Sequence, residues 1–486
     1  MGNTSSIGGD TIKLTISKII TMTMSFIIVM ILSRYFSLEE YGTYSQIIII
    51  VNLVGSLFML GLPNSINYFL ARSETKVEKQ KFLSVYYSLS TYISIGVGIL
   101  LLFLTPFFVQ YFNNRLLQSL VYFLAIYPWT LFIKQSIDHV LIVYKKLSLI
   151  MFYRIINSVS ILLLLVIVQY LNLSFKLFMF IYILLEGFFA ISVYFIVKKV
   201  ADGLKIEIDK YTIKNILKYS IPIGLASAVG TLNIQLDKLM VGRYLGTELL
   251  GIYTNASREL PITIVATSLT AILIPQLTIL LKKEKKDITI NLWSHASILA
   301  FIIICFFALV FFTFASDVMN LLYSEKFITG VSVFRVFCLV LLLRFTYFGM
   351  ILNAVGNTKF IFYSSIFSLF LNFCLNYVFL VSLGFIGPAI ATLISQFVIN
   401  VIQLVYTCKI IKIKFIEILP WKILGFILLI NISFGWIFYV IKENIELDVL
   451  LGSIFESIIL GTIWGGIYLL LFRKTINKSW RVLNTK

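Results

Sequence analysis

Long apolar runs, separated by short polar stretches, follow one another along almost the whole chain. A run of about 18 or more apolar residues is long enough, at about 1.5 Å per helical residue, to cross the hydrocarbon core of a bilayer. Fourteen such segments are predicted, at residues 12–33, 42–70, 82–105, 117–143, 148–169, 174–197, 216–242, 250–281, 291–314, 331–352, 359–382, 387–411, 419–441 and 449–472. The pattern therefore predicts an all-α polytopic membrane protein with 14 transmembrane helices.

The polar stretches divide the basic residues unequally between the two sides of the membrane. One set of connections, together with the C-terminal tail, holds twenty-six Lys and Arg residues. The alternate set holds only six: Arg34, Arg115, Lys176, Arg243, Lys326 and Lys442. Because cytoplasmic loops collect Lys and Arg, this split predicts an even number of spans and places both termini in the cytoplasm. The same split accounts for the net charge of +18 without a nucleic-acid partner.

The composition of the chain agrees with a membrane protein and argues against metal-dependent and enzymatic functions. The 486 residues are 59% hydrophobic and 13% charged, whereas soluble domains have about 25% charged residues. The four cysteines are far apart and there are only two histidines, so we expect no disulfide framework, metal site or cofactor. No phosphate-binding loop or hydrolase motif occurs, and no outer connection is long enough for an active-site domain. The sequence therefore predicts a transporter and not a membrane-bound polymerase or ligase.

One eleven-residue phrase occurs twice, each time directly after an apolar run. Residues 34–44 read RYFSLEEYGTY and residues 243–253 read RYLGTELLGIY, with five identities at a constant offset of 209. Many transporters are built from internal repeats, with the substrate site between them. The repeat therefore predicts two pseudo-symmetric six-helix lobes and a final helix pair. The boundaries are an N-lobe at 1–200, a cytoplasmic linker at 201–215, a C-lobe at 216–412, and a C-terminal helix pair with a cytoplasmic tail at 413–486.

The repeated phrase is predicted to shape the outer corner of each lobe. Its glycines, Gly42 and Gly251, fit a tight entry into the next helix. Its Arg and Glu residues fit capping or pairing, and its tyrosines suit the membrane interface. We do not expect a substrate site there.

Eleven ionisable residues are predicted to lie at membrane depth, where a charge is unfavourable unless it has a partner or faces water. Six cations are predicted to line a substrate-binding cavity: Arg154, Arg258, Arg344, Lys134, Arg335 and Lys18. Such a cavity suits an anionic cargo, because a guanidinium group matches phosphate oxygens with two hydrogen bonds. Four acids are candidates for ion coupling or charge pairing: Asp237, Glu259, Glu186 and Asp138.

Structural explanations of these charges stay open beside the cavity. Lys134 and Asp138 are four residues apart on one helix face, where they can neutralise each other. Arg335 and Lys238 lie nearer to helix ends, where long side chains reach the interface. For the three arginines that lie deeper, both a water-filled cavity and a structural ion pair are open.

Proline marks one of these charged positions as special. A proline inside a helix removes a backbone hydrogen bond, and the break is tolerated where a neighbouring helix or a cavity satisfies the freed carbonyl. The run Arg258-Glu259-Leu260-Pro261 places two charges beside such a break in the eighth predicted span. The sequence therefore predicts a discontinuous, charged helix there.

Several stretches resemble the oligosaccharide flippases (O-antigen or capsule repeat-unit, Wzx-type) of the polysaccharide biosynthesis branch of the multidrug/oligosaccharidyl-lipid/polysaccharide (MOP) exporter superfamily. They are RYFSLEEYGTY at 34–44, GLPNSINYFLAR at 61–72, QLDKLMVGRYLGTELLGIYTNA at 235–256, LNAVGNTK at 352–359 and GFIGPAIATLISQ at 384–396. The resemblance covers nearly the whole length and agrees with fourteen spans.

The resemblance implies a V-shaped MOP-type transporter with a central cationic cavity that opens to one side at a time. Its cargo would be undecaprenyl-diphosphate-linked oligosaccharide, moved from the cytoplasmic to the outer leaflet of the bacterial cytoplasmic (inner) membrane. The product would serve O-antigen (lipopolysaccharide), capsule or exopolysaccharide synthesis, with polymerase or chain-length machinery as a further partner beside the lipid bilayer. Coupling to a proton or sodium gradient, or to the membrane potential, is left open by the sequence.

Two alternatives use the same fold. One is a lipid II flippase, whose members carry arginines in spans one and two; here span one offers Lys18 and span two only Arg72 at its cytoplasmic end. The pair Arg258–Glu259 does resemble residues of that branch. The other is an ion-coupled exporter of small molecules similar to the multidrug exporters.

Overall fold

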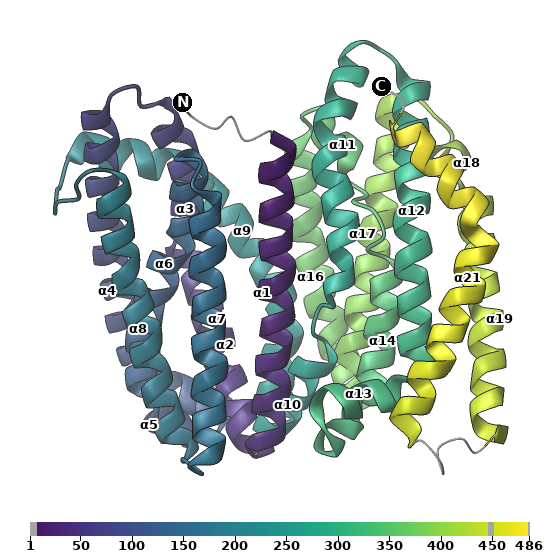
Figure 1. Ribbon diagram of the computed structural model, residues 1–486, viewed down its shortest axis with the longest axis horizontal. Helices are drawn as coiled ribbons and strands as arrows, with labels where there is room; N and C mark the ends of the chain where they lie inside the picture. Colours follow the sequence, from purple (N-terminus) through teal and green to yellow (C-terminus); the bar gives the residue numbers. More distant parts are fainter. Residues whose placement is uncertain (1–6, 446–451, 485–486) are drawn as a thin grey trace. The chain divides into compact units, whose positions relative to one another are not determined.

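A computed structural model of the chain describes the backbone of residues 7–445 and 452–484 and the side chains of residues 19–444 and 452–484. Within these ranges all regular secondary structure is helical (Figure 1). The chain divides into two compact units, unit 1 up to Gly251 and unit 2 from Ile252. The two units are described separately.

Unit 1 contains ten helical elements and the first half of an eleventh. They are α1 (Ile7–Tyr35), α2 (Leu38–Phe58), α3 (Leu62–Ser65), the π-helix η1 (Ile66–Leu70), α4 (Lys76–Phe112), α5 (Leu116–Ser119), α6 (Val121–Val143), α7 (Leu147–Tyr170), α8 (Phe175–Val200), α9 (Lys210–Tyr244) and the first residues of α10 (Thr247–Ala256). The principal packing partners are α4 with α6, α6 with α8, and α1 with α7. Helix α9 packs on α2 and α3 and belongs to unit 1. The predicted division of the chain into two lobes at residues 201–215 stays a prediction.

Unit 2 continues the helical arrangement. Its elements are the 3-10 helix η2 (Pro261–Thr263), α11 (Ile264–Lys282), α12 (Lys286–Thr313), α13 (Ala315–Tyr323), η3 (Glu325–Gly330), α14 (Val331–Leu342), α15 (Met350–Ala354), α16 (Thr358–Leu383), η4 (Gly384–Ile386), α17 (Gly387–Ile411), α18 (Phe415–Ile418), α19 (Trp421–Ile445) and α21 (Ser453–Asn484). Helix α12 lies at the centre of the unit, because α11, α14, α19 and α21 all pack on it.

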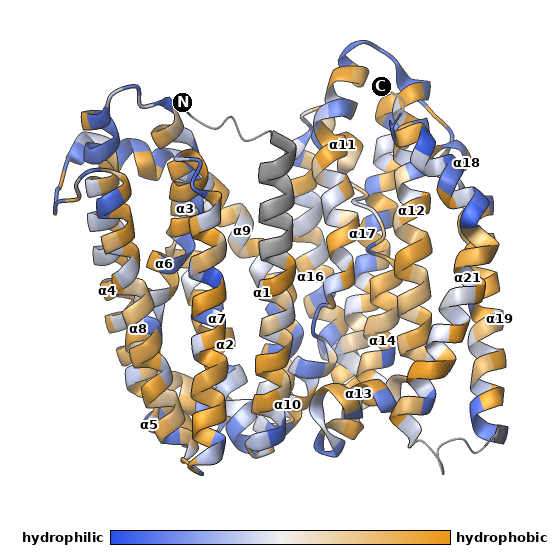
Figure 2. Ribbon diagram, viewed as in Figure 1, coloured by the Kyte–Doolittle hydropathy of each residue, from blue (hydrophilic) through white to orange (hydrophobic). Residues whose placement is uncertain are grey.

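Every one of the fourteen predicted spans coincides with helical structure in the part of the chain that is described, which confirms the predicted fold class. Four predicted spans are broken: 42–70 into α2, α3 and η1, 117–143 into α5 and α6, 250–281 into α10, η2 and α11, and 331–352 into α14 and α15. Among the described residues, nine helical stretches are long and apolar enough to cross a membrane, and one of them holds both α16 and α17. Figure 2 shows the apolar residues concentrated along the helices.

The two copies of the repeated phrase meet in unit 1. A Cβ added to Gly42 would lie 2.1 Å from the Thr247 carbonyl oxygen, and one added to Gly251 would lie 3.1 Å from the Gly42 Cα. Gly42 lies inside α2, so the predicted role in a tight helix entry is wrong there. The two glycines instead let two helices approach closely, and the Gln46 amide donates to the Thr247 hydroxyl beside them (3.0 Å).

The other residues of the phrase also differ from the prediction. Ser37 and Glu40 form a capping box at the start of α2, so the capping acid is the neighbour of the repeated Glu39. Tyr253 is fully buried against Phe337, so it is no interface anchor. The predicted capping or pairing role holds, however, for Arg243, which donates to the carbonyls of Gln110 and Tyr111 (3.1 Å and 2.8 Å) at the end of α4.

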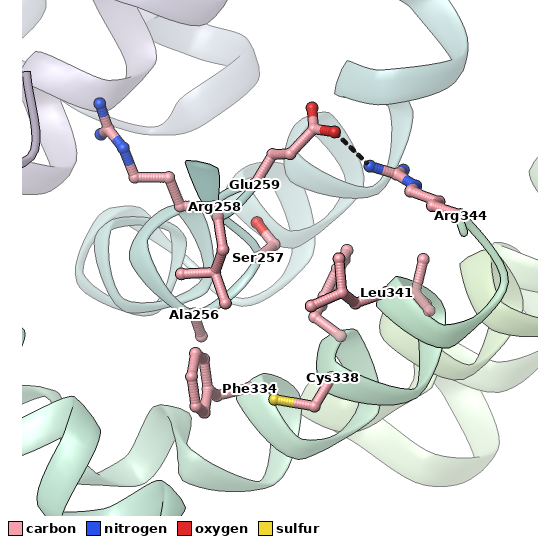
Figure 3. A pocket seen from close by; sticks show the side chains of 11 residues that line it. Ala256, Ser257, Arg258, Glu259, Phe334, Cys338, Leu341 and Arg344 are labelled. Atoms are coloured by element: carbon pink, nitrogen blue, oxygen red, sulfur yellow. Dashed lines mark ion pairs between the residues drawn. The ribbon is translucent and has the colours of Figure 1, made fainter. Parts of the chain in front are cut away.

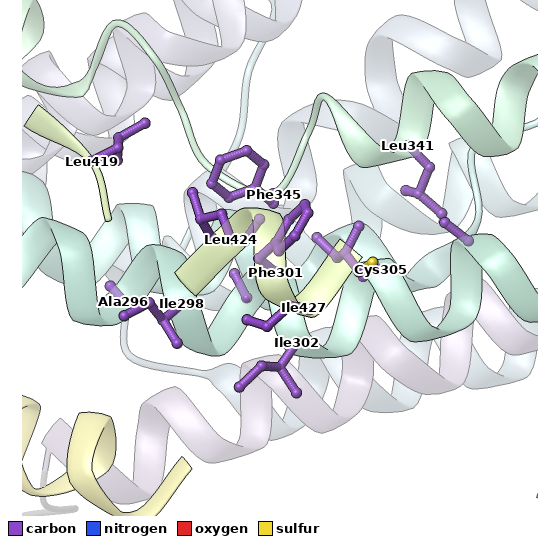
Figure 4. Packing of buried hydrophobic residues seen from close by; sticks show 14 of the residues in the cluster. Ala296, Ile298, Phe301, Ile302, Cys305, Leu341, Phe345, Leu419, Leu424 and Ile427 are labelled. Atoms are coloured by element: carbon purple, nitrogen blue, oxygen red, sulfur yellow. The ribbon is translucent and has the colours of Figure 1, made fainter. Parts of the chain in front are cut away.

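An aromatic core stabilises unit 2 around α12. Phe301 packs edge-on against Phe345, with ring centroids 4.9 Å apart, and Cys305 and Ile427 lie in the same buried cluster (Figure 4). In a bilayer such rings stabilise a fold through close packing and not through removal from water, because lipid tails are as apolar as the core. The cluster fixes the residues that follow α14, which carry part of the candidate site.

Candidate functional site

The first part of the site is the break between α10 and α11. Helix α10 ends at Ala256, and helical structure resumes only at Pro261. Proline cannot donate a backbone hydrogen bond, so the break predicted beside Pro261 is confirmed. In the connection between α10 and α11, Arg258 is half-buried and Glu259 is exposed.

The second part is a break that the sequence did not indicate. Helix α14 ends at Leu342 and α15 begins at Met350, so Arg344 lies in a non-helical connection. The Asn400 amide of α17 donates to the freed carbonyl of Leu343 (3.0 Å). The Trp293 indole of α12 donates to the Thr346 hydroxyl (2.8 Å). Polar side chains from two neighbouring helices therefore satisfy the break, as required inside an apolar bundle.

These two breaks lie beside one small pocket of unit 2, shown in Figure 3. Its volume is about 30 Å³, and its lining is Ala256, Ser257, Arg258, Glu259, Leu260, Phe334, Phe337, Cys338, Val340, Leu341 and Arg344. A carboxylate oxygen of Glu259 lies 3.3 Å from a guanidinium nitrogen of Arg344. The side chain of Arg258 extends away from that ion pair (Figure 3).

The ion pair at this pocket is accessible to solvent. The side chains of Arg344 and Glu259 are 33% and 54% exposed. Exposed pairs contribute only about 0–1 kcal/mol, because water and salt screen them.

Two predicted cavity residues of unit 1 lie in a different environment. Lys134 of α6 donates to Glu186 of α8 (2.5 Å) and to the Asn157 amide oxygen of α7 (3.2 Å). Arg154 of α7 pairs with Asp138 of α6. The prediction that Lys134 and Asp138 neutralise each other is wrong, because each is paired with a residue of another helix.

These unit 1 pairs join three helices of one bundle. The side chains of Lys134 and Glu186 are only 19% and 4% exposed, and those of Arg154 and Asp138 are 27% and 28% exposed. The structural ion pair that was open for Arg154 is what the structure shows. A substrate role for these four residues stays a prediction.

The remaining predicted site residues lie outside the unit 2 pocket. Arg335 is in α14, where its Nε donates to the Phe312 carbonyl (3.3 Å). Asp237 of α9 is buried and accepts a hydrogen bond from the Lys238 backbone N–H (2.8 Å). Lys18 belongs to α1, but its side chain lies outside the described residues. Of the six predicted cations, only Arg258 and Arg344 line this pocket.

Comparison with known proteins defines the family. The family model described as polysaccharide biosynthesis protein matches residues 7–281, which is more than half of the chain. No curated protein matches the chain.

Solved structures show the same fold. The lipid II flippase MurJ in an inward closed conformation is 18% identical, with a TM-score of 0.74 over 96% of this chain and 100% of that chain. An inward-facing multidrug resistance MATE family transporter of the MOP superfamily is 16% identical, with a TM-score of 0.68 over 83% of this chain and 98% of that chain. A MOP superfamily transporter from Pyrococcus furiosus is 14% identical, with a TM-score of 0.52 over 83% of this chain and 96% of that chain. The chain therefore belongs to the polysaccharide biosynthesis protein family and has the multi-pass membrane fold of MOP superfamily transporters.

Proposed function

We propose that the protein is a flippase that moves polyprenyl-diphosphate-linked oligosaccharide from the cytoplasmic to the outer leaflet of the bacterial cytoplasmic membrane. The lipid-linked units would supply O-antigen, capsule or exopolysaccharide synthesis. The family membership supports this proposal, and so does the chemistry of the unit 2 pocket.

The observation that carries the proposal is the exposed Arg344–Glu259 pair between two broken helices, with Arg258 on the same pocket. Transporters often form their substrate sites at discontinuous helices. A guanidinium group binds a phosphate through two parallel hydrogen bonds, and its charge persists at every physiological pH. In the proposed step, a diphosphate oxygen replaces the Glu259 carboxylate on Arg344.

The pocket is too small for the whole cargo, and this agrees with the proposed role. A volume of about 30 Å³ holds a water molecule and not a sugar or a prenyl chain. The pocket would therefore supply contacts to one phosphate group, while the prenyl tail stays in the lipid. Hydrocarbon excludes a charged headgroup, so such contacts must replace its hydration.

The membrane potential can drive the outward step. With an inside-negative potential, transfer of an anion to the outer side is favoured by about 2.3 kcal/mol per charge per 100 mV. If a proton or sodium gradient contributes as well, the buried Asp237 and the exposed Glu259 are the candidate coupling acids. Glu186 and Asp138 are weaker candidates because each is held by a cation in the unit 1 bundle.

A deletion strain tests the proposed function. Cells that lack the protein should accumulate lipid-linked oligosaccharide in the inner leaflet and lose it from the outer leaflet, with normal synthesis. The double substitution Arg258→Gln and Arg344→Gln should reduce outer-leaflet labelling by at least about tenfold, since hydrogen bonds to charged groups contribute about 1.5–3 kcal/mol. The matched control is Arg473→Gln, at an exposed position of α21. Wild-type labelling in the double variant would refute the proposal.

The likeness to the lipid II flippase favours one second candidate, export of a peptidoglycan precursor. Such a precursor also carries a diphosphate, so the pocket alone does not distinguish the two cargoes. Complementation distinguishes them. A lipid II flippase would restore growth to cells depleted of their own lipid II flippase, whereas a flippase for lipid-linked oligosaccharide would restore only the surface polymer.

A further inference from the structure

A second and larger hollow lies entirely within unit 1. Its volume is about 430 Å³, which is in the range of small-molecule sites, about 300–1,000 Å³. Asn52 and Ser56 of α2 and Gln135 and His139 of α6 line two of its sides. Each pair is spaced by four residues, so each pair occupies one helix face.

Helix α9 supplies the third side with the same spacing. Ser227, Thr231 and Gln235 follow one another at intervals of four residues and all line the hollow. Helices α6 and α9 are absent from the described stretches that are apolar enough to cross a membrane, although both are long enough. Part of the polar character of these two helices is thus gathered in one place.

Glycine fixes the geometry at one end of the hollow. Helix α2 ends there, and Leu60 and Gly61 both have positive φ (50° and 66°). A Cβ on Gly224 of α9 would lie 2.2 Å from the Leu60 carbonyl carbon. A larger residue at Gly224 would push α9 away from the break, so the close approach of α2 and α9 depends on it.

The hollow is polar but carries no fixed charge. None of the residues that line it is Lys, Arg, Asp or Glu. A phosphate would find no counter-charge there, and an apolar chain would give the lining amides no hydrogen-bond partner. The amides offer both donors and acceptors. The hydroxyls of Ser56, Ser227 and Thr231 donate to carbonyls of their own helices and offer acceptors, and the hydroxyl groups of a neutral sugar can match both kinds.

Two side chains have hydrogen-bonding capacity left for such a ligand. The Gln235 Oε1 atom is buried, yet none of the described residues donates a hydrogen bond to it. His139 Nδ1 lies 2.9 Å from the Asn67 amide nitrogen, so the neutral ring carries its proton on Nε2. A buried acceptor and a ring donor therefore belong to the same hollow.

We propose that this hollow is a subsite for a neutral sugar residue of the transported lipid-linked oligosaccharide. The inference rests on the proposed function, and it concerns the sugar and unit 1 alone. Specificity for the sugar then comes from the amide and hydroxyl faces of α2, α6 and α9.

Binding to the purified full-length protein in nanodiscs tests the assignment with two probes. One probe is undecaprenyl diphosphate, and the other is the same lipid carrying one N-acetylhexosamine. The wild type should bind the sugar-bearing lipid at least about tenfold more tightly, because the sugar adds several hydrogen bonds. The double substitution Gln135→Leu and Gln235→Leu should abolish this preference and leave affinity for undecaprenyl diphosphate within about twofold.

Controls separate loss of the site from loss of the fold. Gln169→Leu makes the same change on an exposed turn of α7 and should keep the preference. Ser227→Ala with Thr231→Val is a second test variant, since these hydroxyls donate only to backbone carbonyls of their own helix (3.0 Å and 3.1 Å). This variant should unfold at the wild-type temperature and still lose at least about threefold of the sugar preference.

The outcomes distinguish the two proposals. Equal affinity of the wild type for both lipids would overturn the sugar subsite and leave the proposed function standing. Equal weakening of both lipids by the Gln135→Leu and Gln235→Leu variant would do the same. If the wild type binds neither lipid, the proposed function fails first and the subsite falls with it.

Discussion

Both units place ion pairs among apolar helices, but they expose them to very different degrees. In unit 1 the carboxylate of Glu186 is 4% exposed and its partner Lys134 is 19% exposed. In unit 2 the corresponding values for Glu259 and Arg344 are 54% and 33%. Removing one partner leaves an uncompensated charge in the first case and a hydrated charge in the second. The less exposed pair is therefore predicted to stabilise unit 1, and the more exposed pair of unit 2 is predicted to bind an anion.

The backbone around these pairs differs in the same way. Lys134, Asp138, Arg154 and Glu186 all lie within continuous helices, α6, α7 and α8. Glu259 and Arg344 both lie in non-helical connections. A continuous helix fixes its side chains against its neighbours, whereas a connection can adjust its dihedral angles when a ligand arrives. The comparison thus predicts that substitutions in the unit 1 ion pairs affect stability, whereas substitutions in the Arg344–Glu259 pair of unit 2 affect transport.

The largest effect is expected for Glu186→Gln. This change leaves the buried ammonium of Lys134 without its carboxylate, which destabilises a protein by about 3–5 kcal/mol. The thermal unfolding temperature of the purified protein should fall clearly below that of the wild type. Replacing both partners, Lys134→Met with Glu186→Leu, should restore most of the loss, because no charge is then buried. Unfolding of Glu186→Gln at the wild-type temperature would contradict the structural role.

The sequence predicts some features of the candidate site and not others, and the difference can be seen at particular residues. The apolar runs and Pro261 predict the helices and the break beside Arg258, because both are local signals. The break at Arg344 has no proline, and it is satisfied by Asn400, which is far away in the sequence. Tertiary contacts of this kind are invisible in a single sequence. For the same reason, the sequence could pair Lys134 with its local neighbour Asp138 but could not find Glu186.

The polar hollow of unit 1 could have been found. Its residues recur at intervals of four in three predicted spans, at 52 and 56, at 135 and 139, and at 227, 231 and 235. The predicted cavity was based on charged residues, and the residues of this polar face are uncharged. An uncharged polar face within an apolar span deserves the same weight as a charge, because it too must find partners away from water.

The second largest effect is expected for Arg154→Gln. Its pair with Asp138 is more than a quarter exposed on both sides, so we expect a smaller loss of about 1–3 kcal/mol. Because Arg154 acts in the bundle, the transport rate per folded molecule should stay within about twofold of the wild type. The measurement combines thermal unfolding with outer-leaflet labelling normalised to folded protein. A loss of transport by tenfold in stable protein would return Arg154 to the substrate path.

A smaller stability effect is expected for Glu259→Gln. The side chains of Glu259 and Arg344 are 54% and 33% exposed, so the free energy of unfolding should change by less than about 1 kcal/mol. The freed guanidinium should instead bind undecaprenyl diphosphate more tightly, by about threefold or more. The two measurements are thermal unfolding and lipid binding. A destabilisation as large as that of Glu186→Gln would erase the difference between the units.

The smallest effect is expected for the ion pair of Asp209 with Lys81 in unit 1. It tests whether the exposure of a pair, and not the unit in which it lies, decides how much the pair stabilises the protein. Asp209 caps α9, and the hydrogen bond from the Thr212 hydroxyl lowers its pKa below the usual 3.8. Desolvation opposes this shift, and the Thr212 backbone N–H and Lys81 add smaller contributions that lower the pKa. Because the folded pKa is lowered, the stabilisation is complete above pH 3.8 and is lost as the pH falls through the folded pKa. The unfolding temperatures of the wild type and Asp209→Asn should therefore differ slightly at neutral pH and converge in that acidic window. A difference that does not depend on pH would mean that the charge of the Asp209 carboxylate contributes nothing to stability.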